Sequence, residues 1–148
     1  MSTTLRIDVQ AHSRHSYPCG WTSPAKLVRS AVGAGLNGIA LTDHNTMAGI
    51  EDARAAAPTG FYVIAAEEVD TPDGQIIGLF LDEAIDPWQN AETVLDEIHN
   101  QGGLAFAPHP FDAYRKGLET IDELAGKLDA VEVLNSRCVR TRFNHRAE

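Results

Sequence analysis

Short apolar segments alternate along this chain with longer amphipathic ones, and turn-forming residues separate them. Five segments are predicted to be strands: Leu5–Val9, Gly38–Thr42, Phe61–Ala66, Leu104–Ala107 and Ala130–Leu134. Phe61–Ala66 is almost wholly apolar, which is typical of a strand buried on both faces. The turn sequence Pro72-Asp73-Gly74 predicts a hairpin, after which Gln75–Leu81 returns as a further strand.

The amphipathic segments predict helices between these strands. Ser23 and Pro24 form an N-cap and a first helical turn, and Gly33 and Gly35 help to end that helix. Further helices are expected at Thr46–Ala57 and Ala91–Gln101, and the polar final stretch, Arg137–Glu148, looks like the opening of another. This alternation is typical of βα units, so we expect an α/β fold with a mostly parallel sheet.

The length, hydrophobic content and charge of the chain indicate a single-domain protein that neither spans a membrane nor binds nucleic acid non-specifically. With 148 residues and 43% hydrophobic side chains, we expect one domain, residues 1–148, with one sizeable core. No apolar run approaches the roughly 20 residues that span a bilayer, and the N-terminal residues lack the apolar stretch of a secretory signal. We therefore expect a cytoplasmic protein without membrane contact. The formal charge of −9 disfavours non-specific attraction to nucleic acid.

Two cysteines, Cys19 and Cys138, lie far apart, and neither belongs to a Cys-x-x-Cys pair. The pattern does not indicate a thiolate zinc site, and in a reducing cytoplasm both are expected to be free thiols. Cys19 follows a cluster of polar residues and could face a site there. A role as a small buried apolar residue is favoured for it.

Metal-ligand residues stand where four of the predicted strands give way to loops. They are His12, His44, Glu68 and His109. Side chains from the C-terminal ends of parallel strands meet at one edge of a βα barrel, so these four are expected to converge on metal ions. Gln10 shares a strand face with His12 because side chains alternate, but glutamine is a weaker ligand than imidazole.

In this order, four short motifs resemble those of the PHP family, named for polymerases and histidinol phosphatase. They are Asp8-x-Gln10-x-His12-Ser13, Thr42-Asp43-His44, Ala66-x-Glu68 and Pro108-His109-Pro110. The resemblance implies a distorted (βα)7 barrel that binds two or three divalent ions, of zinc, manganese, iron or magnesium. It also implies hydrolysis of phosphate esters by a metal-activated water.

The resemblance also implies roles for single residues. His12 would be a ligand of the first ion and Glu68 the carboxylate bridging two ions. His109 would serve the second ion and His44 a third, so Glu68 and His109 would be catalytic as well as metal-binding. Asp43 would orient a ligand rather than bind metal.

The sequence departs from the family pattern in four places. Gln10 replaces a histidine, Ala66 replaces a glycine, and Gln75 falls where many members carry a further histidine. A late Gly-Ser-Asp-Ala-His motif is absent. We therefore expect an incomplete barrel whose last strands are missing, and a chain truncated relative to the family. Such a chain would be a fragment of a longer protein or would complete its site as a homo-oligomer.

Several polar residues have two interpretations. Alternation sends Glu67 to the face opposite Glu68, and His15 could supply a missing ligand, although a solvated loop residue is favoured. Arg14 and Arg137 could meet a phosphate, with a role as surface charges favoured. His99 and His145 are expected to be structural or solvated.

Three functions are compatible with these patterns. The first is a metal-dependent phosphoesterase acting on a small phosphate ester, with nucleic acid a less favoured substrate because of the charge. The second is a degenerate PHP module that binds metal weakly and acts as an interaction domain, which Gln10 and Gln75 would suit. The third, an amidohydrolase, is disfavoured because that barrel places a lysine at a middle strand end and this sequence has none there.

Overall fold

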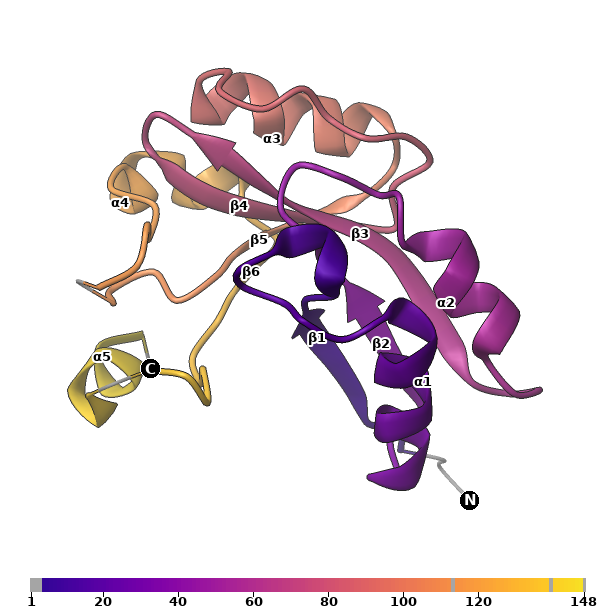
Figure 1. Cartoon of the computed structure of the whole chain (residues 1–148). Helices are drawn as coiled ribbons and strands as arrows, with labels where there is room; N and C mark the ends of the chain where they lie inside the picture. The colour runs from indigo at the N-terminus through magenta and orange to yellow at the C-terminus, as the bar shows by residue number, and fades with distance from the viewer. Residues whose placement is uncertain (1–3, 113, 139, 148) are drawn as a thin grey trace.

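A curled six-stranded sheet forms the centre of the molecule, with helices along its outer face (Figure 1). The structure is a computed structural model and describes residues 4–112, 114–138 and 140–147. The strands follow one another in the sheet in chain order, from β1 to β6. The sheet forms the wall of a half barrel, as the resemblance to the PHP family implied, and the βα alternation correctly predicted mostly parallel strands.

The first three strands are parallel and the fourth reverses direction. β1 (Ile7–Ala11), β2 (Gly38–Leu41) and β3 (Tyr62–Thr71) pair in parallel. β4 (Gly74–Leu79) is antiparallel to both β3 and β5 (Leu104–Ala107), and β6 (Ala130–Val131) is parallel to β5. All strands except β4 thus share one direction, and their C-terminal ends lie along one edge.

Three helices cover the outside of this wall. α1 (Pro24–Gly33) begins at the N-cap Ser23, whose side chain accepts a hydrogen bond from the Lys26 amide. α2 (Ile50–Ala56) packs beside it, and α3 (Ala91–Asn100) lies over the other half of the sheet (Figure 1). A 3-10 turn, η1 (Arg14–Ser16), follows β1.

The chain after β5 is less regular. α4 (Ile121–Leu124) and the 3-10 turn η2 (Ala125–Lys127) precede β6. The last helix, α5 (Thr141–Ala147), lies apart from the sheet at the lower left of Figure 1. No helix in the described ranges is long and apolar enough to cross a membrane.

Two apolar clusters hold the helices on the sheet. One contains Val94, Leu95 and Ile98 of α3 packed on β4 and β5, and the other packs Val28 and Ile50 on β2 and β3. A smaller cluster on the inner face is formed by Ala40, Ala66, Ile77, Leu79 and Phe106. The inner face of the sheet carries few apolar residues because polar side chains lie on it near the C-terminal ends of the strands.

The predicted boundaries differ from the structure at several elements. β1 spans Ile7–Ala11 rather than Leu5–Val9, since its pairing with β2 begins at Ile7 and Leu5 is exposed. β3 continues to Thr71 because the hairpin with β4 extends it past Ala66. The second helix begins at Ile50, not Thr46, and β6 ends at Val131.

Candidate metal centre

Glu68 stands at the centre of the polar end of the sheet, on the inner face of β3. It pairs with Ile77 of β4 in the hairpin, and a bridge joins it to His44 after β2. Its side chain is 1% exposed. A buried carboxylate is costly unless charged or polar partners satisfy it, so the neighbours of Glu68 define the site.

Three imidazoles surround this carboxylate. His12 Nε2 lies 3.1 Å from Glu68 Oε2, and His109 Nε2 lies 3.3 Å from Oε1. His44 Nδ1 lies 3.9 Å from Oε2. These are the four residues that the sequence predicted to converge. His12, His44 and His109 follow β1, β2 and β5, whereas Glu68 lies within β3, where the hairpin with β4 continues past it.

The two histidines nearest Glu68 each keep one ring nitrogen without a protein partner. The Nδ1 atoms of His12 and His109 are buried and accept or donate no hydrogen bond among the described residues. Buried polar atoms are nearly always satisfied, so each such atom calls for an explanation. These two ring nitrogens are therefore available to a ligand.

Asp43 fixes the loops that carry His12 and His44. Its carboxylate accepts hydrogen bonds from the Ser13 amide at 2.6 Å, from Ser13 Oγ at 2.6 Å and from Ser16 Oγ at 2.7 Å. Ser16 Oγ also accepts a hydrogen bond from the His44 amide at 2.7 Å. Asp43 therefore positions the histidines, as predicted.

Gln10 contacts the carboxylate in place of the usual histidine. Its Nε2 donates to Glu68 Oε2 at 3.2 Å, and its Oε1 accepts a hydrogen bond from Asn135 Nδ2 at 3.0 Å. Asn135 also donates to Glu132, which accepts a hydrogen bond from the His109 amide at 2.7 Å. The segment after β6 thus holds both Gln10 and His109 in place.

Gln75 supports His44 from β4. Its Nε2 lies 3.4 Å from His44 Nδ1 and donates to Asp70 Oδ1 at 3.0 Å. Asp70 also accepts a hydrogen bond from Asn45 Nδ2 at 2.8 Å. Gln75 therefore links the imidazole to a carboxylate at the mouth of the site.

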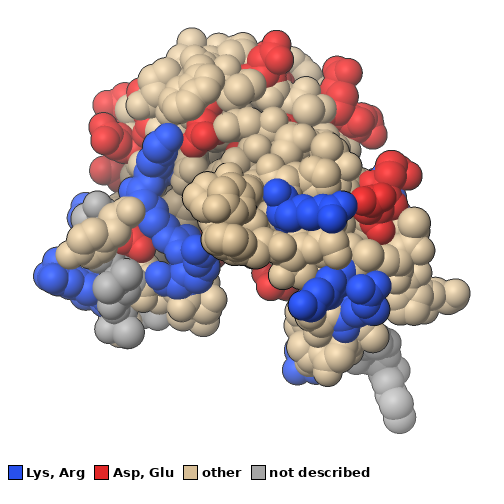
Figure 2. Space-filling model, in the orientation of Figure 1, with Lys and Arg blue, Asp and Glu red and all other residues tan. Residues whose placement is uncertain are grey.

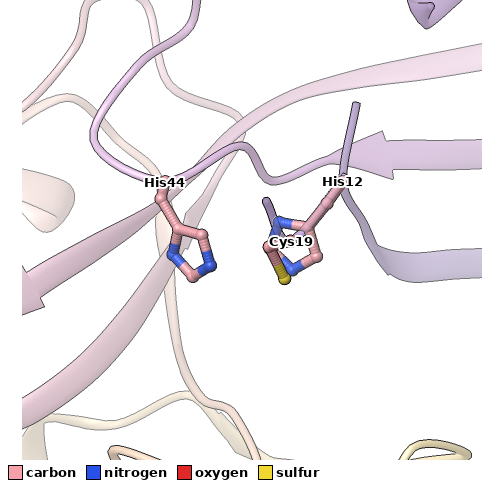
Figure 3. A group of neighbouring side chains, drawn as sticks. All are labelled: His12, Cys19 and His44. Carbon is pink, nitrogen blue, oxygen red and sulfur yellow. The ribbon is translucent and has the colours of Figure 1, made fainter. Parts of the chain in front are cut away.

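Cys19 lies beside two of the histidines, as Figure 3 shows. Ligand atoms of His12, Cys19 and His44 all lie within 4.8 Å of one another, and the two imidazoles stack with centroids 4.7 Å apart. A Cβ on the next residue, Gly20, would overlap the backbone of Ser13, so glycine permits this close approach. The favoured interpretation of Cys19 as a buried apolar residue is wrong, because the side chain is half-buried and lines a cavity.

The cavity above these side chains has a volume of about 290 Å³. The candidate ligands line its floor, and three cationic side chains line it as well: Arg115, Lys116 and Arg137. Arg137 Nη1 lies 3.2 Å from Cys19 Sγ. In the view of Figure 2, Lys and Arg side chains lie on the left and also over the centre and lower right, although the chain as a whole is acidic. The polar end of the sheet can therefore attract an anion.

Charge states at the site suit metal binding. Burial alone raises the pKa of Glu68, but hydrogen bonds from His109 and His12 outweigh it and hold the pKa well below its usual value. Burial lowers the pKa of His44 by more than the attraction of Glu68 raises it. An ionised carboxylate and a neutral imidazole are the forms that coordinate a cation.

None of the remaining sequence candidates contacts Glu68, although Arg137 and His15 line cavities that His44 and Cys19 also line. Glu67 faces the opposite side of β3, as predicted, and accepts a hydrogen bond from the Ile85 amide at 2.9 Å. His15 is exposed, and His145 belongs to α5. His99 belongs to α3, and its Nε2 lies 3.0 Å from Asp129 Oδ2. Arg14 is exposed in η1, whereas Arg137 reaches the cavity.

Sequence reasoning missed several residues of the site: Arg115, Lys116, Asp70, Glu132 and the contact made by Asn135. None of them belongs to a motif with fixed spacing. The basic pair Arg115-Lys116, six residues after His109, was the one available signal, since basic pairs near a predicted metal site favour anion binding.

Comparison with known proteins agrees with this geometry. The family model described as PHP domain matches residues 8–130. Uncharacterized protein MJ1587 of Methanocaldococcus jannaschii is 34% identical over 143 residues, which cover 89% of this chain and 82% of that protein. A 5'-3' exoribonuclease of Haemophilus influenzae is 39% identical over 85 residues, covering 54% of this chain and 30% of that one.

A solved structure shares the fold at lower sequence identity. It is a candidate metal-dependent phosphoesterase from Bifidobacterium adolescentis, with a TM-score of 0.79 and 16% identity. The alignment covers 98% of this chain and 82% of that one. The curled sheet is therefore the βα-barrel fold of such proteins.

Proposed function

The chain belongs to the PHP domain family, and we propose that it is a metal-dependent phosphoesterase that hydrolyses phosphate esters. One observation carries this proposal: a buried carboxylate and three imidazoles converge below a cavity lined by three cationic side chains. The carboxylate and imidazoles suit divalent cations, and the cationic side chains suit a phosphate.

The residues present fit a metal centre. Glu68 is ionised and central, so its carboxylate would hold a cation, and His12, His44 and His109 would supply nitrogen ligands. Within the described part of the chain, the buried Nδ1 atoms of His12 and His109 have no protein partner, which supports a donor set that is open to a ligand. Cys19 offers a sulfur donor within reach of His12 and His44, which favours zinc over magnesium.

Each part of the site has a task in phosphoester hydrolysis. Bound divalent ions supply charge that offsets the phosphate and acidify a coordinated water. Arg115, Lys116 and Arg137 hold the anion over the floor of the cavity. Asp43, Gln75 and Glu132 keep the candidate ligands and their loops in place, which preserves the geometry when substrate binds.

The interaction-module hypothesis is less well supported than the enzyme. Gln10 and Gln75 do replace histidines, but both still contact the candidate ligands, through Glu68 and His44. A degenerate module has no need of a buried, ionised carboxylate surrounded by imidazoles. As a substrate we propose a small phosphate ester, because the net charge of −9 disfavours a long polyanion.

Phosphate release tests the proposal. The protein is stripped with a chelator, reloaded with manganese or zinc, and assayed for hydrolysis of p-nitrophenyl phosphate. We expect turnover that depends on metal and is lost in Glu68→Gln but kept in Glu83→Gln, an exposed residue outside the site. Protein shown to hold metal that releases no phosphate from any of several monoesters would contradict the proposal.

A further inference from the structure

The side chain of Gln10 ends in two different groups. Its carbonyl oxygen can coordinate a cation, whereas its amide nitrogen can donate hydrogen bonds to an anion. The residue belongs to β1, two positions before His12, and it lines the cavity above the candidate ligands. The group that faces the centre therefore decides whether Gln10 serves a metal ion or the substrate, and the hydrogen-bond partners of Gln10 fix that orientation.

Asn135, a buried residue after β6, has a side-chain amide whose orientation is set by two partners. Its Oδ1 accepts a hydrogen bond from the Arg137 backbone amide at 2.9 Å, and a backbone N–H can only donate. Its Nδ2 lies 3.1 Å and 3.0 Å from the two carboxylate oxygens of Glu132, which accept. Turning the amide over would place its carbonyl against the carboxylate and its NH2 group against the backbone N–H. Asn135 therefore presents N–H groups to Glu132 and to Gln10.

The orientation of Asn135 determines that of Gln10. Gln10 Oε1 accepts a hydrogen bond from Asn135 Nδ2 at 3.0 Å, so its carbonyl is already engaged. Gln10 Nε2 donates to Glu68 Oε2 at 3.2 Å, so its amide nitrogen faces the candidate ligands. If the Gln10 amide were turned over, its carbonyl would face the Glu68 carboxylate and its NH2 group would face that of Asn135. Two unfavourable contacts would then replace two hydrogen bonds beside a buried charge.

One N–H group of Gln10 remains for a ligand. A side-chain amide carries two N–H groups, and among the described residues the partner of Gln10 Nε2 is Glu68. Gln10 lines two cavities, of about 290 and 280 Å³, and Arg115 and Arg137 line both of them. An amide donor and two guanidinium groups around the same openings suit an oxyanion rather than a cation.

We propose that Gln10 donates a hydrogen bond to the phosphoryl oxyanion bound at this centre and is not a metal ligand, and that Asn135 is the positioning residue that holds it in this orientation. This inference rests on the proposed phosphoesterase function and adds one residue to its anion site. A donor in this place stabilises charge on a phosphoryl oxygen without coordinating an ion. Relative to the histidine usual in the family, glutamine at position 10 exchanges a cation ligand for an anion donor.

Binding of inorganic phosphate tests the inference without turnover. Zinc is titrated into metal-free protein, and phosphate into zinc-loaded protein, by calorimetry on wild type, Gln10→Met and the control Gln89→Met. Methionine has nearly the length of glutamine but no N–H group, and Gln89 binds Glu97 outside both cavities. We expect Gln10→Met to bind phosphate about 10-fold more weakly and zinc within about 3-fold of wild type. Gln89→Met should match wild type in both titrations.

Two further measurements address the orientation of the amide. The side-chain NH2 resonances of Gln10, identified in NMR spectra by their loss in Gln10→Met, should shift when phosphate is added to zinc-loaded protein. Asn135→Ser keeps an oxygen that can accept from the Arg137 amide but loses the NH2 group that reaches Gln10. This variant should also bind phosphate more weakly. Adding Gln10→Met to it should cost less than about 2-fold more, because the two residues act through one contact.

Three results would overturn the inference. One is a loss of zinc affinity in Gln10→Met that equals or exceeds its loss of phosphate affinity, as expected of a metal ligand. Another is equal phosphate affinity in Gln10→Met and wild type, including no measurable binding by either. The third is a Gln10 NH2 signal that stays unshifted at saturating phosphate. Failure of phosphate release from p-nitrophenyl phosphate, in contrast, counts against the proposed function and leaves these binding measurements intact.

Discussion

Glu68 and His109 are 41 residues apart in sequence, yet His109 Nε2 lies 3.3 Å from Glu68 Oε1 at the buried end of the sheet. The insertion of antiparallel β4 between β3 and β5 makes this contact possible, because it leaves both strands pointing in one direction. The parallel pairing of β1, β2 and β3 brings His12 and His44 to Oε2, the second oxygen of the carboxylate. Convergence of these four residues is the structural basis of the proposed metal chemistry.

Asp43 is expected to be essential for stability as well as for the site. Replacing it with Asn removes a buried charge that accepts three hydrogen bonds and places an amide donor against Ser13 or Ser16. We expect the free energy of unfolding to fall by about 3 kcal/mol, measured by urea denaturation. Asp82→Asn, at an exposed position, should change it by less than about 0.5 kcal/mol. Equal stability of the two variants would show that the Asp43 contacts contribute little.

Cys19 should act as a metal ligand, unlike Cys138. We expect Cys19→Ser to weaken zinc binding about 10-fold or more, because a hydroxyl is a poorer donor to zinc than a thiolate. Cys138→Ser is the matched control, since that thiol donates to Asp112 outside the centre. In wild-type protein, zinc should slow the reaction of one of the two thiols with a disulfide reagent. Equal protection of both thiols, or of neither, would contradict this role.

Restoring the family histidine at position 10 should strengthen metal binding. In Gln10→His an imidazole replaces the amide that now contacts Glu68, and imidazole is the better ligand for zinc and manganese. Titration calorimetry should show a several-fold lower dissociation constant. Gln10→Ala separates this gain from the loss of the Asn135 hydrogen bond, and its affinity should not rise. A weaker affinity in Gln10→His than in Gln10→Ala would argue against an open coordination position there.

Glu67 should make stability depend on pH. Burial raises the pKa of Glu67 from 4.5 to about 7, so the folded protein holds a proton there that the unfolded chain releases. This contribution to stability is fully present below about pH 4.5 and is lost as the pH rises through about 7.

The Glu67→Gln variant isolates this effect, because glutamine resembles the protonated acid. Relative to wild type, the variant should gain about 2 kcal/mol in unfolding free energy between pH 5 and pH 8, measured by urea denaturation. His44, whose pKa is lowered, acts in the opposite direction but equally in both proteins. A difference between the two proteins that stays constant with pH would mean that Glu67 is ionised throughout.

Local sequence patterns predicted most of the fold because its elements satisfy local rules. The cap Ser23 and the glycines near the ends of α1 and α3 predicted those helix ends within a residue or two. Alternation along β3 correctly separated Glu68 from Glu67, since residues two apart share a face. β1 was misplaced because its register depends on pairing with β2, a long-range contact that local apolarity does not report.

The four central site residues were predictable because each belongs to a recognisable motif in or directly after a strand. Residues that reach the site from irregular segments were not. Arg115, Lys116 and Glu132 come from the chain after β5, where the structure has short helices and loops. Cys19 was misjudged because its position depends on the fold of the loop around Gly20, which Asp43 and Ser16 stabilise from another part of the chain.

Metal content of wild-type protein and Glu68→Gln tests the central claim most directly. Both proteins are dialysed against zinc or manganese, freed of excess ions and measured by elemental analysis, with Glu83→Gln as the control. We expect at least one tightly held ion per wild-type or control chain. Glu68→Gln should lose most of it, because the change removes the buried negative charge at nearly constant volume. Wild-type protein without bound metal, or Glu68→Gln with the same metal content and affinity as wild type, would contradict the account.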